Sequence, residues 1–213
     1  MIKGCIFDLD GVIVDTAKYH YKAWKRLAEE LGFEFTEKDN ERLKGVSRMK
    51  SLDILLSVGN LSFSDKEKLF MAEKKNSWYV EYISKMDKSE LLPGVEDFLK
   101  ELHSKNIKVA LGSASKNSML IMRNLELEKY FDAIVDGNMV SKAKPDPEVF
   151  LIAAEKINLT PWECAVFEDS QAGIEAAKLA GMKAVAVGSS NNLKDFDRII
   201  SSFEKLNIDF LNF

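Results

Sequence analysis

Short apolar runs rich in β-branched residues recur along the chain, with amphipathic segments between the later ones. We predict a strand for each run, at residues 4–9, 107–111, 133–135, 165–167 and 184–187. Strands that alternate with helical periodicity form parallel sheets covered by helices. The pattern therefore predicts an α/β fold built on a Rossmann-like parallel sheet.

Residues 16–91 interrupt this alternation. Apolar positions recur there with helical spacing over 19–31, 49–58 and 66–83, and no convincing strand pattern is present. We therefore predict an all-helical domain at 16–91, inserted after the first strand. The core domain would consist of residues 1–15 and 92–213.

Composition narrows the class of protein. The 213 residues are 46% hydrophobic and 30% charged, and 30 Lys and Arg against 34 Asp and Glu leave no basic excess for nucleic acid. No apolar run approaches the roughly 20 residues that span a bilayer, and the first residues lead into a strand rather than a signal peptide. We expect a cytoplasmic monomer that binds neither nucleic acid nor membrane. Cys5 and Cys164 lie in predicted strands, which favours buried, reduced thiols.

Two carboxylates lie at the end of the first predicted strand. Asp8 and Asp10 are two residues apart, so an extended chain projects both side chains to the same side. Such a pair suits a divalent cation, a nucleophile or both. Two solvated aspartates in a turn before Gly11 are the alternative interpretation.

Polar residues also follow the other predicted strands, where open parallel sheets bind their ligands. A small polar turn, 112–117, follows the second strand and could bind an anion or simply cap a helix. Lys144 follows the third strand, and Glu168 and Asp169 end the fourth. An ordinary solvated side chain is the alternative for Lys144.

Four carboxylates in one crevice would repel one another strongly unless a cation lay among them. Hard oxygen ligands favour Mg²⁺. The chain has only two histidines, and neither cysteine lies at a strand end, which disfavours Zn²⁺. Because Mg²⁺ with open positions commonly binds substrate phosphate, the pattern indicates phosphoryl transfer on a small molecule.

The order and context of these residues resemble the four motifs of the haloacid dehalogenase superfamily. The resemblance implies that Asp8 is a nucleophile that forms an aspartyl phosphate and that Asp10 is a general acid and base. It also implies an Mg²⁺ site formed by Asp8, the Asp10 carbonyl, Glu168 and Asp169. The implied ligands of the transferring phosphoryl group are Ser113, Ala114, Ser115, Asn117 and Lys144.

Within the superfamily, the chain resembles phosphosugar mutases at His20 and in the strings 15–17, 44–48, 113–117 and 168–174. The resemblance implies interconversion of β-D-glucose 1-phosphate and glucose 6-phosphate through the 1,6-bisphosphate. Arg48 has the planar guanidinium suited to a phosphate that is not being transferred. The other expected substrate contacts of the insert are Thr16, His20, Trp24, Lys44, Gly45, Ser47 and Lys75.

Each of these residues also has an ordinary structural interpretation. Thr16, His20 and Trp24 share one helix face, which fits a core stripe as well as a site in which His20 reaches Asp10. Lys75 could lie on a solvated face. At the level of function, a sugar-phosphate or phosphoglycolate phosphatase would use water as the acceptor. A non-catalytic phosphate-binding regulatory module is the alternative of another class. Such a module could dispense with Asp8 or Asp10, and this chain has both.

Overall fold

The computed structural model describes residues 1–43, 46–189 and 193–213. The chain divides into two compact units, one formed by Met1–Asp15 with Met86–Phe213 and the other by Thr16–Lys85. Residues 86–91, which we placed in the insert, therefore belong to the first unit. Leu91 forms a β-bridge with Val14, and the Leu92 N–H donates to the Ile13 carbonyl at 3.0 Å. These contacts hold the segment against the turn that follows the first strand.

A six-stranded sheet in the order β3-β2-β1-β4-β5-β6 forms the centre of the first unit, and every neighbouring pair is parallel. The predicted parallel α/β architecture is thus confirmed. The strands are β1 (Gly4–Phe7), β2 (Lys108–Gly112), β3 (Ala133–Val135), β4 (Cys164–Glu168), β5 (Lys183–Val187) and β6 (Arg198–Ile200). We missed β6, because it begins with a charged residue and contains only two apolar ones, Ile199 and Ile200.

The register of the central strands decides which side chains meet at the edge of the sheet. Phe7 pairs with Leu111 on one side and with Phe167 on the other. Asp8, Gly112 and Glu168, which follow these residues, therefore lie side by side where the strands end. The carboxyl ends of β1, β2 and β4 form a single row.

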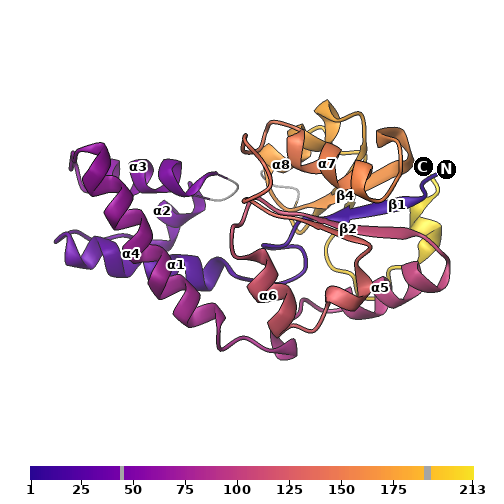
Figure 1. The fold of residues 1–213 in the computed structure, drawn as a ribbon, viewed down its shortest axis with the longest axis horizontal. Helices are drawn as coiled ribbons and strands as arrows, with labels where there is room; N and C mark the ends of the chain where they lie inside the picture. Colours follow the sequence, from indigo (N-terminus) through magenta and orange to yellow (C-terminus); the bar gives the residue numbers. More distant parts are fainter. Residues whose placement is uncertain (44–45, 190–192) are drawn as a thin grey trace. The chain divides into compact units, whose positions relative to one another are not determined.

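Helices cover both faces of the sheet. Figure 1 shows α7 (Glu148–Lys156) and α8 (Gln171–Leu179) on one face and α5 (Val95–Ser104) on the other. Ile6 and Val166 face the first pair, in a cluster with Phe150. Their neighbours in sequence, Phe7 and Phe167, stack at 4.8 Å on the opposite face, where Phe98 and Phe203 pack against them. Alternate residues of β1 and β4 thus fill two separate apolar layers.

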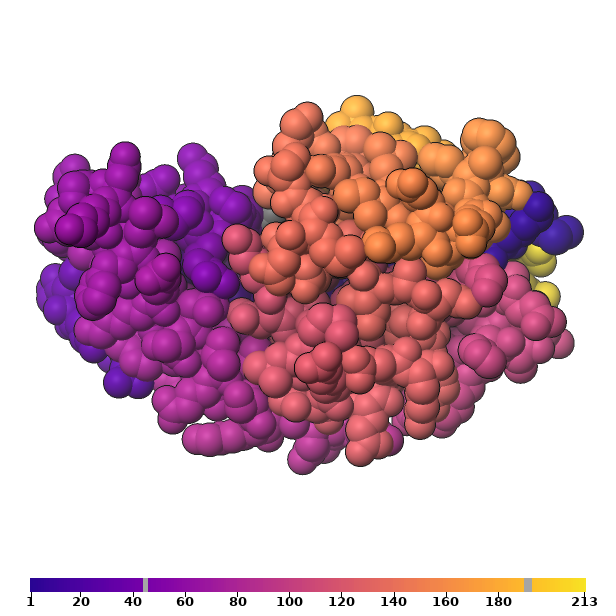
Figure 2. Space-filling view, viewed as in Figure 1, coloured from indigo at the N-terminus to yellow at the C-terminus, as the bar shows by residue number. Residues whose placement is uncertain are grey.

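Shorter segments complete the first unit. The helix α6 (Ser118–Asn124) follows β2, and single 3₁₀ turns precede α5, β3 and β4 or follow β6. These turns are η1 (Lys88–Glu90), η2 (Glu128–Tyr130), η3 (Pro161–Glu163) and η5 (Ile208–Leu211). In Figure 2 segments after residue 100, coloured pink to orange, make up most of the surface of the first unit on the face shown.

The second unit is helical in its described residues, as the pattern predicted. Its helices are α1 (Ala17–Glu30), α2 (Glu37–Glu41), α3 (Arg48–Val58) and α4 (Asp65–Ile83), and α4 packs against both α1 and α3. Apolar side chains such as Leu27, Leu55 and Ile83 are buried between them. No helix in the described residues of either unit is long and apolar enough to cross a membrane.

Candidate active site

The turn after β1 presents Asp8 beside the end of β4. The Asp8 N–H donates to the Phe167 carbonyl at 3.0 Å, so the backbone hydrogen bonds between β1 and β4 continue as far as Asp8. Gly11 then turns the chain with a φ of 80°. A Cβ at Gly11 would lie 2.0 Å from an Asp169 carboxylate oxygen, so only glycine leaves space for Asp169 here. The predicted turn at Gly11 therefore lies directly against one of the predicted acids, Asp169.

A buried lysine joins two of the acids. Lys144 Nζ donates to Asp8 Oδ1 at 2.6 Å and to Glu168 Oε2 at 2.7 Å. The three side chains are only 3%, 9% and 2% exposed, respectively. Burial alone would lower the pKa of Lys144, but the charges of Asp8 and Glu168 outweigh it and raise that pKa above its ordinary value. Lys144 is therefore a buried cation and not the solvated lysine of the alternative interpretation.

Three carboxylates form a group that fits a hard cation. Asp8, Glu168 and Asp169 each offer an oxygen, and these oxygens lie within 4.8 Å of one another. Carboxylate oxygens are the ligands that Mg²⁺ and Ca²⁺ prefer. Among the described residues, the side chain of Asp10 is not part of this group.

The pKa values of this group are raised first by burial and then by repulsion between the acids. Burial, followed by the charges of Glu168 and Asp10, raises the pKa of Asp8 to about 7 against the opposing effect of Lys144. Burial, followed by the charges of Glu168 and Asp8, raises the pKa of Asp169 to about 8. A divalent cation among these oxygens would favour their charged forms.

The turn after β2 is ordered by its own hydroxyls. Ser113 is fully buried, and its Oγ accepts the Ser115 N–H at 3.1 Å, while the Ser115 Oγ accepts the Asn117 N–H at 3.3 Å. A hydroxyl that accepts in this way keeps its proton for a further acceptor. Ala114 is exposed in the same turn. The arrangement leaves Ser113 able to donate to an anion beside the row of strand ends.

A second turn supports the first, and we did not predict it. The Gly137 N–H donates to the Ser115 carbonyl at 3.1 Å, and Asn138 Nδ2 donates to the Lys116 carbonyl at 3.1 Å. The buried Asp136 accepts from Asn138 through both carboxylate oxygens. The Asp-Gly-Asn string directly after β3 has the composition of a turn, and that signal could have identified it.

A cluster in the second unit joins α1 and α4. Lys75 Nζ lies 2.9 Å from His20 Nδ1 and 4.4 Å from the ring centre of Trp24, and the rings of His20 and Tyr79 stack at 4.0 Å. Lys75 is only 2% exposed, which contradicts the solvated-face interpretation. Thr16 is buried where it precedes α1. Burial, followed by the charges of Lys75 and Arg48, holds the pKa of His20 well below its usual value.

Two further predicted residues of the insert, Ser47 and Arg48, lie at the start of α3. Arg48 is half-buried as the first residue of that helix, and its burial lowers the pKa of the guanidinium. The Ser47 Oγ accepts the Lys50 N–H at 3.4 Å and so caps the helix. Lys44 and Gly45 lie outside the described residues.

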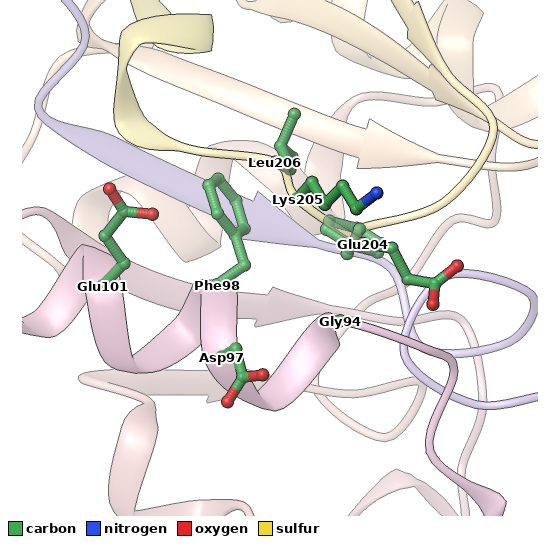
Figure 3. Close-up of a pocket in the computed structure, with 8 residues that line it drawn as sticks. Gly94, Asp97, Phe98, Glu101, Glu204, Lys205 and Leu206 are labelled. Carbon is green, nitrogen blue, oxygen red and sulfur yellow. The ribbon is translucent and has the colours of Figure 1, made fainter.

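A cavity of about 400 Å³ lies elsewhere in the first unit, between α5 and the segment 203–206 (Figure 3). Its walls include Asp97, Glu101 and Lys205 around the ring of Phe98. None of the predicted site residues lines it. The candidate site is therefore the row of strand ends and not this cavity.

Comparison with known proteins gives consistent relatives. Residues 5–187 match the family described as haloacid dehalogenase-like hydrolase. Over 213 residues the chain is 42% identical to the β-phosphoglucomutase of Bacillus subtilis, covering 99% of this chain and 94% of that protein. It is 37% identical to a phosphorylated carbohydrates phosphatase of Thermotoga maritima, covering 91% and 88%. The crystal structure of a β-phosphoglucomutase from Clostridium difficile superposes with a TM-score of 0.93 at 45% identity, covering 99% and 96%.

Proposed function

The chain belongs to the haloacid dehalogenase-like hydrolase family, and from this premise we propose that it is an Mg²⁺-dependent β-phosphoglucomutase. On this proposal it interconverts β-D-glucose 1-phosphate and glucose 6-phosphate through β-D-glucose 1,6-bisphosphate. The observation that carries the proposal is the buried contact of Lys144 with Asp8 and Glu168, beside Asp169. Relatives named as β-phosphoglucomutases, at 42% and 45% identity over almost the whole chain, support the choice of reaction.

Asp8 would attack the phosphorus atom and carry the phosphoryl group as an aspartyl phosphate. An ionised carboxylate needs no base for this attack, but it must approach an anionic phosphate in a buried place. Lys144, whose ammonium group already contacts Asp8 Oδ1, would offset that repulsion. Ser113, Ala114, Ser115 and Asn117 in the turn after β2 would hold the phosphoryl oxygens.

Mg²⁺ would be held by the carboxylates of Asp8, Glu168 and Asp169 together with the Asp10 carbonyl. The ion would neutralise charge on the transferring phosphoryl group. We assign proton transfer to the Asp10 side chain, which is not part of the three-carboxylate group. It would protonate the leaving sugar oxygen and later accept the proton of the attacking hydroxyl.

The second unit would hold the rest of the substrate. A bisphosphate needs a second anion site, and the half-buried guanidinium of Arg48 suits the phosphate that is not reacting. Lys75, fixed against His20 and Trp24, would contact a sugar hydroxyl. We propose Lys44, Gly45, Ser47 and Thr16 as further contacts. We also propose that the protein is a monomer acting on a small cytoplasmic sugar phosphate.

A phosphatase on the same scaffold is the second candidate, because a carbohydrate-phosphate phosphatase is 37% identical to this chain. One assay separates the two functions. The protein receives β-D-glucose 1-phosphate, Mg²⁺ and a trace of the bisphosphate, and both glucose 6-phosphate and inorganic phosphate are followed. Rapid isomerisation with little free phosphate supports the mutase. Release of one phosphate per sugar consumed, without glucose 6-phosphate, rejects it.

The role of Asp8 can be tested by direct labelling. With ³²P-labelled bisphosphate, the Asp8→Ala variant should form no covalent phosphoenzyme, because the attacking oxygen is absent. The matched control is Asp65→Ala, which removes an exposed aspartate of α4 in the other unit and should label normally. An Asp8→Ala protein that still labels at the wild-type rate would exclude Asp8 as the nucleophile.

A further inference from the structure

Both carboxylate oxygens of Glu168 are held by the protein. Oε2 accepts from Lys144, while Oε1 accepts from the Ser170 N–H at 3.0 Å and from the Ser170 hydroxyl at 2.7 Å. All three side chains are buried. The contact with Lys144 belongs to the site already described, but the two contacts with Ser170 have no place in the proposed reaction.

The direction of the Ser170 hydroxyl is fixed by the helix that it begins. Ser170 is the N-cap of α8, and its Oγ accepts the Gly173 N–H at 3.1 Å. A hydroxyl has one proton to donate, and with an N–H bound to its oxygen that proton points to Glu168 Oε1. One side chain therefore caps α8 and holds Glu168 at the same time.

Gly173 makes this arrangement possible. A Cβ at this position would lie 2.0 Å from the Glu168 Cδ and 2.1 Å from its Oε2. The Glu168 carboxylate thus lies directly against the first turn of α8, where only glycine leaves space for it. The absence of a side chain and the presence of the Ser170 hydroxyl together define a single position for the carboxylate.

We propose that Ser170 is a positioning residue that holds Glu168 ready to bind Mg²⁺, an inference that rests on the proposed function because it requires the metal. A carboxylate that is already fixed loses no rotamer freedom when the ion binds. Oε1 already accepts two hydrogen bonds and Oε2 accepts one, so Oε2 keeps a lone pair for an ion held among the oxygens of Asp8, Glu168 and Asp169, which lie within 4.8 Å of one another. Hydrogen bonds of this kind to metal ligands change metal affinity by about 10- to 100-fold.

The test measures binding of Mg²⁺ alone to the metal-free full-length protein by isothermal titration calorimetry. Ser170→Gly removes the hydroxyl but leaves a residue that is accepted at N-caps, so the start of α8 is retained. We expect the Kd for Mg²⁺ to rise by about 10-fold. At saturating Mg²⁺, kcat and the KM for the sugar phosphate should return to wild-type values, because Ser170 acts on the metal site rather than on the substrate.

Ser64 provides a matched control. Its hydroxyl also caps a helix, α4, and also donates to a glutamate, Glu67 Oε2, at 2.6 Å. Ser64→Gly therefore removes the same pair of contacts in the other unit, and the Kd for Mg²⁺ should not change. A third variant, Gly173→Ala, keeps the cap but displaces the Glu168 carboxylate, and it should weaken Mg²⁺ binding at least as much as Ser170→Gly.

The outcomes are distinct. The inference is overturned if Ser170→Gly binds Mg²⁺ as the wild type does, if Ser64→Gly changes the Kd equally, or if Gly173→Ala has no effect. A wild-type protein that does not bind Mg²⁺ overturns the metal requirement of the proposed function as well. If the wild type binds Mg²⁺ and only the variants behave unexpectedly, the proposed function stands and the role of Ser170 alone is rejected.

Discussion

Lys144 and Lys3 show how burial decides what an ion pair contributes. Each lysine lies 2.6 Å from a carboxylate oxygen, Lys144 from Asp8 and Lys3 from Glu163. The Lys144 side chain is 3% exposed and that of Lys3 is 60% exposed. Water screens the exposed pair, whereas removing one partner of a buried pair leaves an uncompensated charge in a place of low dielectric.

We predict that Lys144→Met lowers the free energy of unfolding of the metal-free protein by about 3 kcal/mol, the lower end of the range for breaking a buried pair. The estimate is at the lower end because Asp8, with its pKa raised to about 7, can bind a proton instead. The measurement is urea unfolding in the presence of a chelator. The control, Lys3→Met, should leave the midpoint almost unchanged. Equal effects of the two substitutions would contradict the argument from burial.

His20 provides a pH-dependent prediction. Burial and the charges of Lys75 and Arg48 lower its pKa, so the folded protein disfavours the imidazolium. In the unfolded chain a histidine has a pKa of about 6.5. The contribution of His20 to stability is therefore complete above that pH and is lost as the pH falls below it, because the unfolded chain then binds more protons.

The state of His20 can be observed directly by NMR. The chain has only two histidines, and a His103→Gln variant leaves His20 as the single imidazole signal. We expect its shifts to stay those of the neutral ring from pH 8 down to well below about 6.5. Lys75→Met removes the ammonium 2.9 Å from Nδ1 and should raise the pKa of His20. An ordinary titration of His20 in the wild type would refute the assigned environment.

At the scale of elements, the chain's hydrophobic pattern predicted what lies in the core better than what lies at its edges. The strands β1, which Asp8 follows, and β4, which ends in Glu168, are buried on both faces, so they appear as continuous apolar runs. The carboxyl ends of such strands converge by topology alone, which is why Asp8, Lys144, Glu168 and Asp169 could be grouped from sequence. The edge strand β6 offers only two apolar residues after Arg198 and left no such signal.

Contacts that depend on backbone geometry could not be predicted in the same way. The composition after β3 indicates a turn, but the hydrogen bond from Asn138 to the Lys116 carbonyl depends on where two separate turns place their polar groups. No periodicity reports these positions. The burial of Lys75 between α1 and α4 likewise depends on how two helices pack. For this reason the sequence alone did not exclude a solvated position for Lys75.

The start of α3 carries a prediction of its own. Arg48 is half-buried at the first turn of the helix, and we propose that it binds the phosphate that is not reacting. Arg48→Ala should lower kcat/KM for glucose 1-phosphate by about 10- to 100-fold, as expected for the loss of charge-assisted hydrogen bonds of roughly 1.5 to 3 kcal/mol. Hydrolysis of an aryl phosphate, which has no second anion, should change little. The control is Arg42→Ala, an exposed arginine after α2. Equal losses on both substrates would exclude this role.

At the scale of the whole molecule, each of the two units has its own apolar core and only the first contains the carboxylate group. The boundary at residue 85 was harder to predict than the insert itself, since residues 86–91 have no strong pattern and belong to the first unit through Leu91 and Leu92. A short bridge of this kind depends on contacts between segments that are far apart in sequence.

The tryptophans make the two cores separately observable. Trp24 and Trp78 are buried in the second unit, whereas Trp162 in the first unit is 71% exposed and should change little on unfolding. Tryptophan fluorescence therefore reports the second unit, and far-ultraviolet circular dichroism reports both. A ligand that binds only the folded first unit stabilises that unit, by about 2.7 kcal/mol at 100 times its Kd.

We therefore predict that Mg²⁺ shifts part of the dichroism transition in urea to higher concentration and leaves the fluorescence transition in place. Asp169→Asn, which removes one of the three carboxylates, should abolish the shift without moving the fluorescence midpoint. Replacing Mg²⁺ with K⁺ at equal ionic strength controls for screening. If both probes moved together with Mg²⁺, the two cores would unfold as one cooperative unit, and the independence argued from their separate packing would be wrong.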